Sequence, residues 1–367
     1  MFDDIEMAER VVGWLKGGGG NPLMLEIRPT NRCNLQCPSC VSRGHPSQIP
    51  CGEELSERTY LRILDEAATL GVKYVQISGG GEPFVRKKSL LRIMSRIKHH
   101  GMRGFVITNG TLCDRHTVRK MIEFRWDAIL FSIDAPTPEL NDRLRSKKGC
   151  FKKTVSAIKE LVRLKQLQST EVPRIDLGPV LSHQNCHAVV DMVRFAVGLG
   201  VDNLHFQPVH VPDTEDGRLF RLTEDDKATL RESIPSAIGI AEENGLGTNL
   251  EDFDSTLLKN SDDPMKISQA YSSASTHPWL SLRCFSPWYY VGIHPDGAVG
   301  PCSIIDDASD VPNIRDGSLK HIWEGPWFQD FRRSLLENDL LEKCARCSGS
   351  NVMANNTIRE RLRQVVL

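Results

Sequence analysis

Apolar residues recur along the chain in two patterns that alternate with one another. Six short, largely apolar stretches predict strands, at 23–28, 74–78, 104–108, 128–134, 174–180 and 203–210. Stretches with helical periodicity follow them, at 54–70, 88–100, 114–124, 151–167, 187–199 and 223–244. Six strand–helix units in succession indicate an α/β fold with a parallel sheet and right-handed crossovers. Both a partial barrel and an open doubly wound sheet fit this order.

The two faces of the predicted strands differ in polarity, because alternate residues of a strand face opposite sides of the sheet. The apolar face, which is expected to pack on helices, comprises Leu25, Ile27, Val75, Ile77, Phe105, Ile107, Ile129, Phe131, Ile133, Ile175, Leu177, Leu204 and Phe206. The opposite face comprises Glu26, Arg28, Gln76, Ser78, Thr108, Ser132, Asp134, Asp176, His205 and Gln207. Strands of a doubly wound sheet are apolar on both faces. The polar face therefore favours a partial barrel whose lumen can hold ligands.

The rest of the chain divides into shorter segments. A helix-like stretch at 5–15 ends at four consecutive glycines, and the segment from about 245 to 276 is rich in Asn, Asp and Ser. We predict an N-terminal helical lead-in at 1–22, the barrel at 23–245, a linker at 246–278, a cysteine-bearing domain at 279–352 and a C-terminal helix at 353–367.

Charge and composition limit the kinds of binding partner that are expected. Lys and Arg number 46 and Asp and Glu 47, so no net charge attracts nucleic acid or an anionic membrane. No apolar run is long enough to span a membrane, and the first residues lack the features of a signal peptide. We therefore expect a cytoplasmic protein. In such a protein the 11 cysteines indicate metal binding or catalysis rather than disulfides.

Three cysteines follow the first predicted strand. Cys33, Cys37 and Cys40 have the spacing Cys-x3-Cys-x2-Cys in a strand-to-helix loop, where three thiolates can converge on one centre. Three protein ligands leave one iron of a cluster open to another molecule. A zinc site and buried structural thiols are the alternatives, although zinc sites more often use paired Cys-x2-Cys arms.

The ends of the second and third predicted strands carry further candidate residues. Glycines in Ser78-Gly79-Gly80-Gly81-Glu82-Pro83 would let a ligand approach the backbone, and the carboxylate can accept a hydrogen bond from an ammonium group. A tight turn is the alternative for the glycines alone. Asn109, at the end of the next strand, is a further ligand-facing candidate.

A second set of cysteines lies in the last third of the chain. Cys284, Cys302, Cys344 and Cys347 have the spacing Cys-x17-Cys-x41-Cys-x2-Cys, and Asp296-Gly297 predicts a hairpin. Four thiolates can close a metal site completely, with a structural zinc ribbon as the alternative. The other four, Cys51, Cys113, Cys150 and Cys186, lack ligand spacing and are expected to be small buried residues.

The cysteine triplet after the first strand resembles the signature of the radical S-adenosylmethionine (SAM) superfamily. The resemblance implies a partial (β/α)6 TIM-like barrel with a SAM-cleaving 4Fe-4S cluster on Cys33, Cys37 and Cys40. The family usually has an aromatic residue before the last cysteine, where this chain has Ser39. The resemblance further implies SAM contacts by Gly80, Gly81, Glu82, Ser132, Asp134 and Arg145, with Arg143 as a substitute for Arg145.

The C-terminal cysteines resemble those of the SPASM-type auxiliary-cluster domains of radical SAM dehydrogenases, with Asp296-Gly297, Pro301-Cys302 and Asn313-Ile314 as further shared elements. Four cysteines match the shortened Twitch form, which implies one auxiliary 4Fe-4S cluster. Their spacing is similar to that of the aminoglycoside-pathway dehydrogenase that oxidises an amino-cyclitol alcohol to a ketone.

These resemblances imply a radical SAM oxidoreductase. We expect reductive cleavage of SAM to a 5′-deoxyadenosyl radical, which abstracts a hydrogen atom from a small polar substrate. A secondary alcohol of a sugar or cyclitol would become a ketone, with the auxiliary cluster as electron acceptor. His205 and Asp176 are the candidate bases, and a flavodoxin- or ferredoxin-type protein is the expected electron donor.

Three alternatives remain open at this point. An epimerase would return a hydrogen atom from a cysteine such as Cys186. A peptide-modifying maturase would need leader recognition, for which the short segment before Leu23 leaves no room for a separate domain. A zinc-binding interaction protein is the non-enzymatic alternative.

Overall fold

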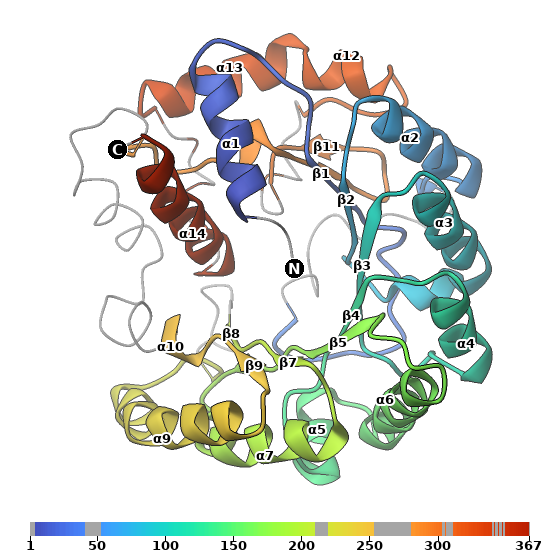
Figure 1. The fold of residues 1–367 in the computed structure, drawn as a ribbon, viewed down its shortest axis with the longest axis vertical. Coiled ribbons are helices and arrows are strands. Elements are labelled where there is room, and N and C mark those ends of the chain that lie inside the picture. The colour runs from blue at the N-terminus through green and yellow to red at the C-terminus, as the bar shows by residue number, and fades with distance from the viewer. Residues whose placement is uncertain are drawn as a thin grey trace.

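The protein is built around one curved sheet. The computed structural model describes residues 4–40, 53–209, 219–252, 280–302, 305, 311–339, 341, 344, 347 and 349–366. The sheet has nine strands in the order β11-β10-β1-β2-β3-β4-β5-β7-β9. Neighbouring strands are parallel except for β10 and β11. They curve into an incomplete barrel with helices on the outside, which confirms the predicted fold (Figure 1).

All six predicted strands are present; five are shorter than expected, and β3 is one residue longer. Their bounds are β1 (Met24–Ile27), β2 (Tyr74–Ile77), β3 (Arg103–Thr108), β4 (Ala128–Phe131), β5 (Arg174–Leu177) and β7 (Asn203–Leu204). The ends of the last two stretches form a separate pair, β6 (Val180–Leu181) with β8 (Gln207–Pro208). The break after β5 falls at Gly178-Pro179, where proline lacks a backbone N–H for the ladder.

The six predicted helices are also present, as α2 (Glu57–Thr69), α3 (Lys87–His99), α4 (Arg115–Glu123), α6 (Cys150–Leu167), α7 (Val189–Leu199) and α9 (Glu224–Glu243). Side-chain oxygens of Ser56, Asp114 and Thr223 cap α2, α4 and α9 by accepting backbone N–H bonds. Four further helices were not predicted from the sequence: α5 (Pro138–Leu144), α10 (Leu250–Asp252), α12 (Leu319–Trp323) and α13 (Pro326–Leu336). No described helix is long and apolar enough to cross a membrane.

The two terminal helices, α1 (Asp4–Leu15) and α14 (Gly349–Val366), pack against each other (Figure 1). The start of α14 lies within the segment predicted as the cysteine-bearing domain. The predicted linker begins with β9 (Gly247–Thr248) and α10, and residues 253–279 lie outside the described residues.

One predicted strand orientation is wrong. Phe105 and Ile107 were expected to face the helices, but in β3 the helix-facing core residue is Val106. Phe105 instead packs with Ala128 and Leu130, and Ile107 joins them on the lumen side. The reason lies at Gly104, where a Cβ atom would come within 2.1 Å of the Trp126 indole. The indole fills the space between Gly104 and the helices. It therefore determines which residues of β3 face the helices.

The cysteine-bearing C-terminal region joins the barrel sheet directly. β10 (Tyr290–Ile293) pairs in parallel with β1, and β11 (Val299–Gly300) adds an antiparallel edge. The hairpin predicted at Asp296-Gly297 is confirmed, with Gly297 at φ +92°. Tyr290 therefore lies beside the first barrel strand.

Candidate active site

The first cysteine loop leaves the carboxyl end of β1. Cys33 and Cys40 are exposed free thiols and Cys37 is partly buried. Burial raises the pKa of Cys33 and Cys37, and the charge of Cys40 raises both further. The backbone N–H of Cys40 donates to the Cys37 carbonyl at 3.2 Å. The three thiols are therefore close neighbours on one exposed loop.

Three thiols on one loop are compatible with a cluster of several irons. Among the described residues, no group of three or more His, Cys, Asp or Glu side chains could hold a metal ion. In an iron–sulfur cluster each cysteine can bind a different iron atom, so the sulfurs need not converge on one point. Three neighbouring thiols at a strand end fit this arrangement.

The glycine run packs against the cysteine loop. A Cβ atom on Gly80 would lie 1.9 Å from Asn31 Oδ1, and one on Gly81 would lie 2.1 Å from the Arg32 carbonyl oxygen. The backbone N–H groups of Gly81 and Glu82 donate to the carbonyls of Thr30 and Arg32 at 3.0 and 2.9 Å. The glycines thus allow a close approach, as expected, but the neighbour is the backbone of the cluster loop.

Glu82 connects the ends of two strands. Its buried carboxylate accepts hydrogen bonds from the backbone N–H groups of Asn109 (2.7 Å) and Phe84 (3.0 Å) and from the Thr108 hydroxyl (2.7 Å). Burial raises the pKa of Glu82. Asn109 in turn donates to Asn34 at 3.0 Å. Glu82 therefore braces the site, and its expected contact with the SAM amine stays a prediction.

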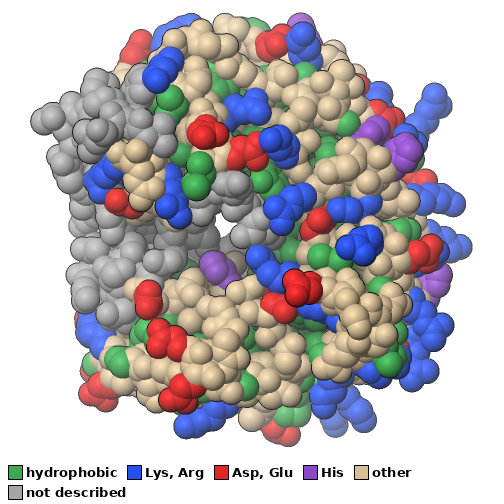
Figure 2. Space-filling model, viewed as in Figure 1, with side chains coloured by type: hydrophobic (Ala, Val, Ile, Leu, Met, Phe, Trp, Pro, Cys, Tyr) green, Lys and Arg blue, Asp and Glu red, His purple; other side chains and the backbone are tan. Residues whose placement is uncertain are grey.

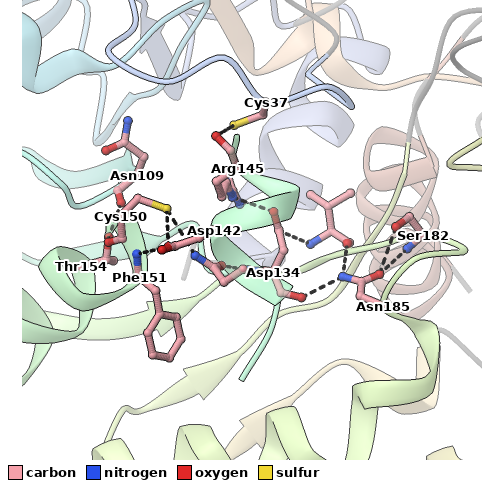
Figure 3. Close-up of polar contacts among 12 residues, drawn as sticks. Cys37, Asn109, Asp134, Asp142, Arg145, Cys150, Phe151, Thr154, Ser182 and Asn185 are labelled. Carbon is pink, nitrogen blue, oxygen red and sulfur yellow. Dashed lines mark hydrogen bonds and ion pairs between the residues drawn. The ribbon is translucent and has the colours of Figure 1, made fainter. Parts of the chain in front are cut away.

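Asp134 and Arg145 lie together beside Cys37 (Figure 3). Arg145 Nε and Asp134 Oδ2 form an ion pair at 2.6 Å, and both side chains are largely buried. Burial opposes the charge of Arg145, but Asp134 holds the pKa of Arg145 above its usual value. The Cys37 thiol contacts the Arg145 carbonyl at 3.8 Å. The structure thus brings together two of the expected SAM contacts, next to a cluster cysteine.

The loop after β4 is held by further polar contacts in the same view. Asp134 accepts from the Val180 N–H at 3.0 Å, and its carbonyl accepts from Asn185 at 2.8 Å (Figure 3). Ser132, the other residue expected here, is partly exposed and its N–H donates to the Thr108 carbonyl at 2.9 Å. These contacts fix the loop that carries the predicted SAM residues.

Glu26, which the sequence placed on the polar lumen face without assigning it a role, is a buried carboxylate. Glu26 accepts from Arg28 (2.8 Å), Ser78 (2.7 Å), Gln76 (3.2 Å) and Tyr290 (2.6 Å). Burial alone would raise the pKa of Glu26, but the Arg28 charge and the hydrogen bonds lower it. A Glu in the middle of an apolar strand was the available signal.

The two candidate bases, Asp176 and His205, differ in solvent exposure. Asp176 is buried, accepts both bonds of a bidentate pair from Arg174 (2.9 and 2.8 Å), and accepts a third from Asn203 at 3.0 Å. His205 is exposed and follows β7 on the same face of the sheet. The side chain of His205 is therefore the more accessible of the two.

The second set of cysteines comes together from distant parts of the chain. Cys284, Cys302 and Cys344 border the same apolar cluster, and the Cys347 N–H donates to the Cys344 carbonyl at 3.2 Å. Burial, with the charge of Cys284, raises the pKa of Cys344 to about 11. Cys113, Cys150 and Cys186 are buried as predicted, and Cys51 lies outside the described residues.

Two family matches define the class of protein. Residues 27–196 match the radical SAM superfamily, and residues 284–348 match SPASM, an iron–sulfur cluster-binding domain. The chain is therefore a radical SAM enzyme with a C-terminal SPASM domain. These domains imply a SAM-cleaving 4Fe-4S cluster, auxiliary cluster binding and SAM as cofactors.

Relatives of known function give a finer comparison. The chain is 26% identical to the PqqA peptide cyclase of Granulibacter bethesdensis over 332 residues, which cover 89% of this chain and 79% of that protein. It is 29% identical over 184 residues to the tungsten-containing aldehyde ferredoxin oxidoreductase cofactor-modifying protein of Pyrococcus furiosus, over 49% of each chain. The expected similarity in cysteine spacing to an aminoglycoside-pathway dehydrogenase is not confirmed.

Solved structures share the fold. Streptococcus suis SuiB matches with a TM-score of 0.68 at 18% identity, over 95% of this chain and 75% of SuiB. Native anSMEcpe with bound AdoMet matches with a TM-score of 0.61 at 17% identity, over 94% and 99% of the two chains. At these identities the likeness concerns the fold alone.

Proposed function

We propose that this enzyme modifies a peptide by abstracting a hydrogen atom from it and then forming or oxidising a bond at that carbon. The observation that carries the proposal is the similarity to PqqA peptide cyclases, which extends over 89% of the chain and not only over the cysteine motifs. SuiB has been solved with its precursor peptide SuiA, and anSMEcpe with a Cp18Cys peptide. A peptide substrate replaces the small alcohol favoured by the sequence.

A cavity lies at the end of the barrel away from the cysteine loop. A cavity of about 790 Å³ is lined by the first residues of β2 to β5, at the opposite end of these strands from the cysteine loop. Phe105 and Ala128 give it an apolar wall, while Arg103 and Glu171 supply charges of both signs.

The visible face of the molecule agrees with this mixed character. Figure 2 shows an opening near the centre, with Lys, Arg, Asp and Glu side chains intermingled beside it. Side chains of both signs lie on this face. A peptide of mixed composition would suit such a surface.

The residues of the chain have distinct tasks in this proposal. Cys33, Cys37 and Cys40 hold the cluster that, when bound, supplies the electron for cleaving SAM to methionine and a 5′-deoxyadenosyl radical. Gly80, Gly81, Ser132 and Arg145 orient SAM, and Glu82 and Asp134 brace them. The barrel walls exclude water. His205 accepts a proton from the substrate, and the C-terminal cysteines hold the electron-accepting cluster.

The proposal is tested with reconstituted enzyme under anaerobic conditions. One reaction contains SAM, a reduced flavodoxin and a mixture of peptides that includes PqqA; a second contains sugars and cyclitols instead. We expect 5′-deoxyadenosine above the substrate-free level only with peptides, together with a peptide product lighter by two hydrogen atoms. Stimulation by sugars or cyclitols with a ketone product, and none by peptides, would overturn the proposal.

A further inference from the structure

Helix α14 holds the backbone on both sides of Cys284. Arg359 donates from Nε to the Leu280 carbonyl at 3.0 Å and from NH2 to the Leu282 carbonyl at 2.6 Å. Asn355, one helical turn earlier, accepts from the backbone N–H of Phe285 at 2.7 Å. Residues four apart share one face of a helix. Two side chains of one helix face thus fix the segments before and after this cysteine.

Arg359 is buried deeply in the region where the auxiliary cysteines meet. Its side chain is 0% exposed, although charged residues are rarely buried completely. The guanidinium lies 5.4 Å from the centre of the Phe285 ring. The cation is therefore held between the Leu282 carbonyl and the Phe285 ring, the residues on either side of the Cys284 segment.

We propose that Arg359 and Asn355 are positioning residues of the auxiliary cluster, and that the buried charge of Arg359 raises the reduction potential of this cluster. Cys284, Cys302 and Cys344 border the apolar cluster into which α14 packs. Reduction adds a negative charge to a cluster, and a nearby cation in a low-dielectric interior stabilises that charge. The inference rests on the SPASM domain and is independent of the substrate.

The charge and the hydrogen bonds can be separated by substitution. Arg359→Met removes both, Arg359→Lys keeps the charge but not the two-pronged donation, and Asn355→Leu removes the second attachment. Arg361→Met is the matched control, because Arg361 is on the same helix and donates to Gln364 in an exposed contact at 3.1 Å. All are made in the full chain with Cys33, Cys37 and Cys40 changed to Ala, so that the remaining iron belongs to the auxiliary site.

Iron content and the midpoint potential are the two measurements, the latter from a redox titration followed by electron paramagnetic resonance. The parent and Arg361→Met are expected to hold about four irons per chain, as one 4Fe-4S cluster requires. Arg359→Met is expected to have a more negative midpoint and less iron. Arg359→Lys should keep most of the potential, and Asn355→Leu should lose iron with little change in potential.

The opposite results would overturn the proposal. Full iron and a parental midpoint in Arg359→Met would show that neither attachment nor charge acts on the cluster. If Arg359→Met assembles no cluster, the other two variants decide. Lower iron in either variant, relative to Arg361→Met, supports the proposal. Parental iron and midpoint in both Arg359→Lys and Asn355→Leu overturn it.

Discussion

The hydroxyl of Tyr290 in β10 donates a 2.6 Å hydrogen bond to the carboxylate of Glu26 in the neighbouring strand β1, although 264 positions separate them in the chain. Arg28 forms an ion pair with the same carboxylate at 2.8 Å. Glu26 is only 3% exposed. The contact ties the C-terminal region to the barrel through a buried charge.

We expect Tyr290→Phe to lower the free energy of unfolding by about 1.5–3 kcal/mol, the usual range for a hydrogen bond to a charged group. Tyr60→Phe is the control, because Tyr60 donates at 2.7 Å to the neutral Arg28 carbonyl. That variant should lose only about 1 kcal/mol. Urea unfolding measures both. Equal losses would contradict a special contribution from the Glu26 charge.

The same variant should change the response to pH. The pKa of Glu26 is lowered in the folded protein, so its contribution to stability is present above the unfolded pKa of about 4.3 and is lost as pH falls through the folded value. Removing the Tyr290 hydroxyl raises the folded pKa toward the unfolded one. The deficit of Tyr290→Phe is therefore expected at neutral pH and should shrink on acidification, which unfolding curves at several pH values would show.

Gly81→Ala is expected to disrupt the cysteine loop. Its Cβ would lie 2.1 Å from the Arg32 carbonyl oxygen, so that the loop carrying Cys33 must move. A displacement of about 1 Å can lower a rate about 100-fold, and we expect a loss of that order in substrate-free SAM cleavage. Gly198→Ala is the control, because nothing lies within 4 Å of its added Cβ. Similar cleavage by both variants would contradict the packing of the glycine run.

The brace around Glu82 can be tested without SAM. Thr108→Val removes a 2.7 Å hydrogen bond to the buried carboxylate and should lower the free energy of unfolding by about 1.5–3 kcal/mol. Thr154→Val is a matched control, since Thr154 donates at 2.7 Å to the neutral Asn109 carbonyl. Its loss should be nearer 1 kcal/mol. If the Thr108→Val protein is as stable as the parent, Glu82 does not stabilise the fold through this hydrogen bond, and its role would be ligand contact alone.

Acidification should lessen the Thr108→Val deficit. Burial already raises the pKa of Glu82, so this group favours the folded state at low pH and loses that contribution as pH rises through the folded pKa. Removing a donor raises the pKa further. The difference from the parent in urea unfolding should thus shrink as the pH is lowered from neutral through the folded pKa of Glu82.

The parts of the fold that sequence could predict are those with local signals. The strand before Cys33 and the helix that begins after Ser56 each follow from a few consecutive residues. Which residues of β3 face the helices could not be predicted, because three consecutive residues, Phe105, Val106 and Ile107, are all apolar. Only Trp126, which comes 22 positions after Gly104 and fills the space beside it, decides which of them faces the helices.

At the candidate site, partners that are distant in the chain likewise could not be predicted from the sequence. The sequence indicated Asp176 as a base, but Arg174 and Asn203 occupy its oxygens. It indicated Glu82 as a ligand-binding residue, but not that its carboxylate also accepts a hydrogen bond from the N–H of Asn109 at another strand end. Residue type alone shows that a side chain can bind; the fold decides what it binds.

Cys186 is expected to resist alkylation in the holoenzyme. It is 3% exposed, and its thiol contacts Asp226 at 3.2 Å. Burial and the Asp226 carboxylate raise the pKa of Cys186 to about 12, so on the order of one thiol in 10⁴ is ionised at pH 8. Labelling with N-ethylmaleimide followed by peptide mass spectrometry should leave it unmodified at pH 8. The rate should rise as pH increases, because the thiolate is the reactive form.

Asp226→Asn should speed the labelling of Cys186, since it removes a charge that disfavours the thiolate. Cys150 is the internal control: burial and Asp142 raise its pKa to about 12 as well, and the substitution does not touch that pair. Faster labelling of both would indicate general opening instead. Rapid labelling of Cys186 in the parent would again make this residue a candidate hydrogen-atom donor.

The Cys186 thiol is directed at Asp226 in α9. We therefore expect Cys186→Ala to leave the product mass and its solvent-deuterium content unchanged, which argues against epimerisation through this residue.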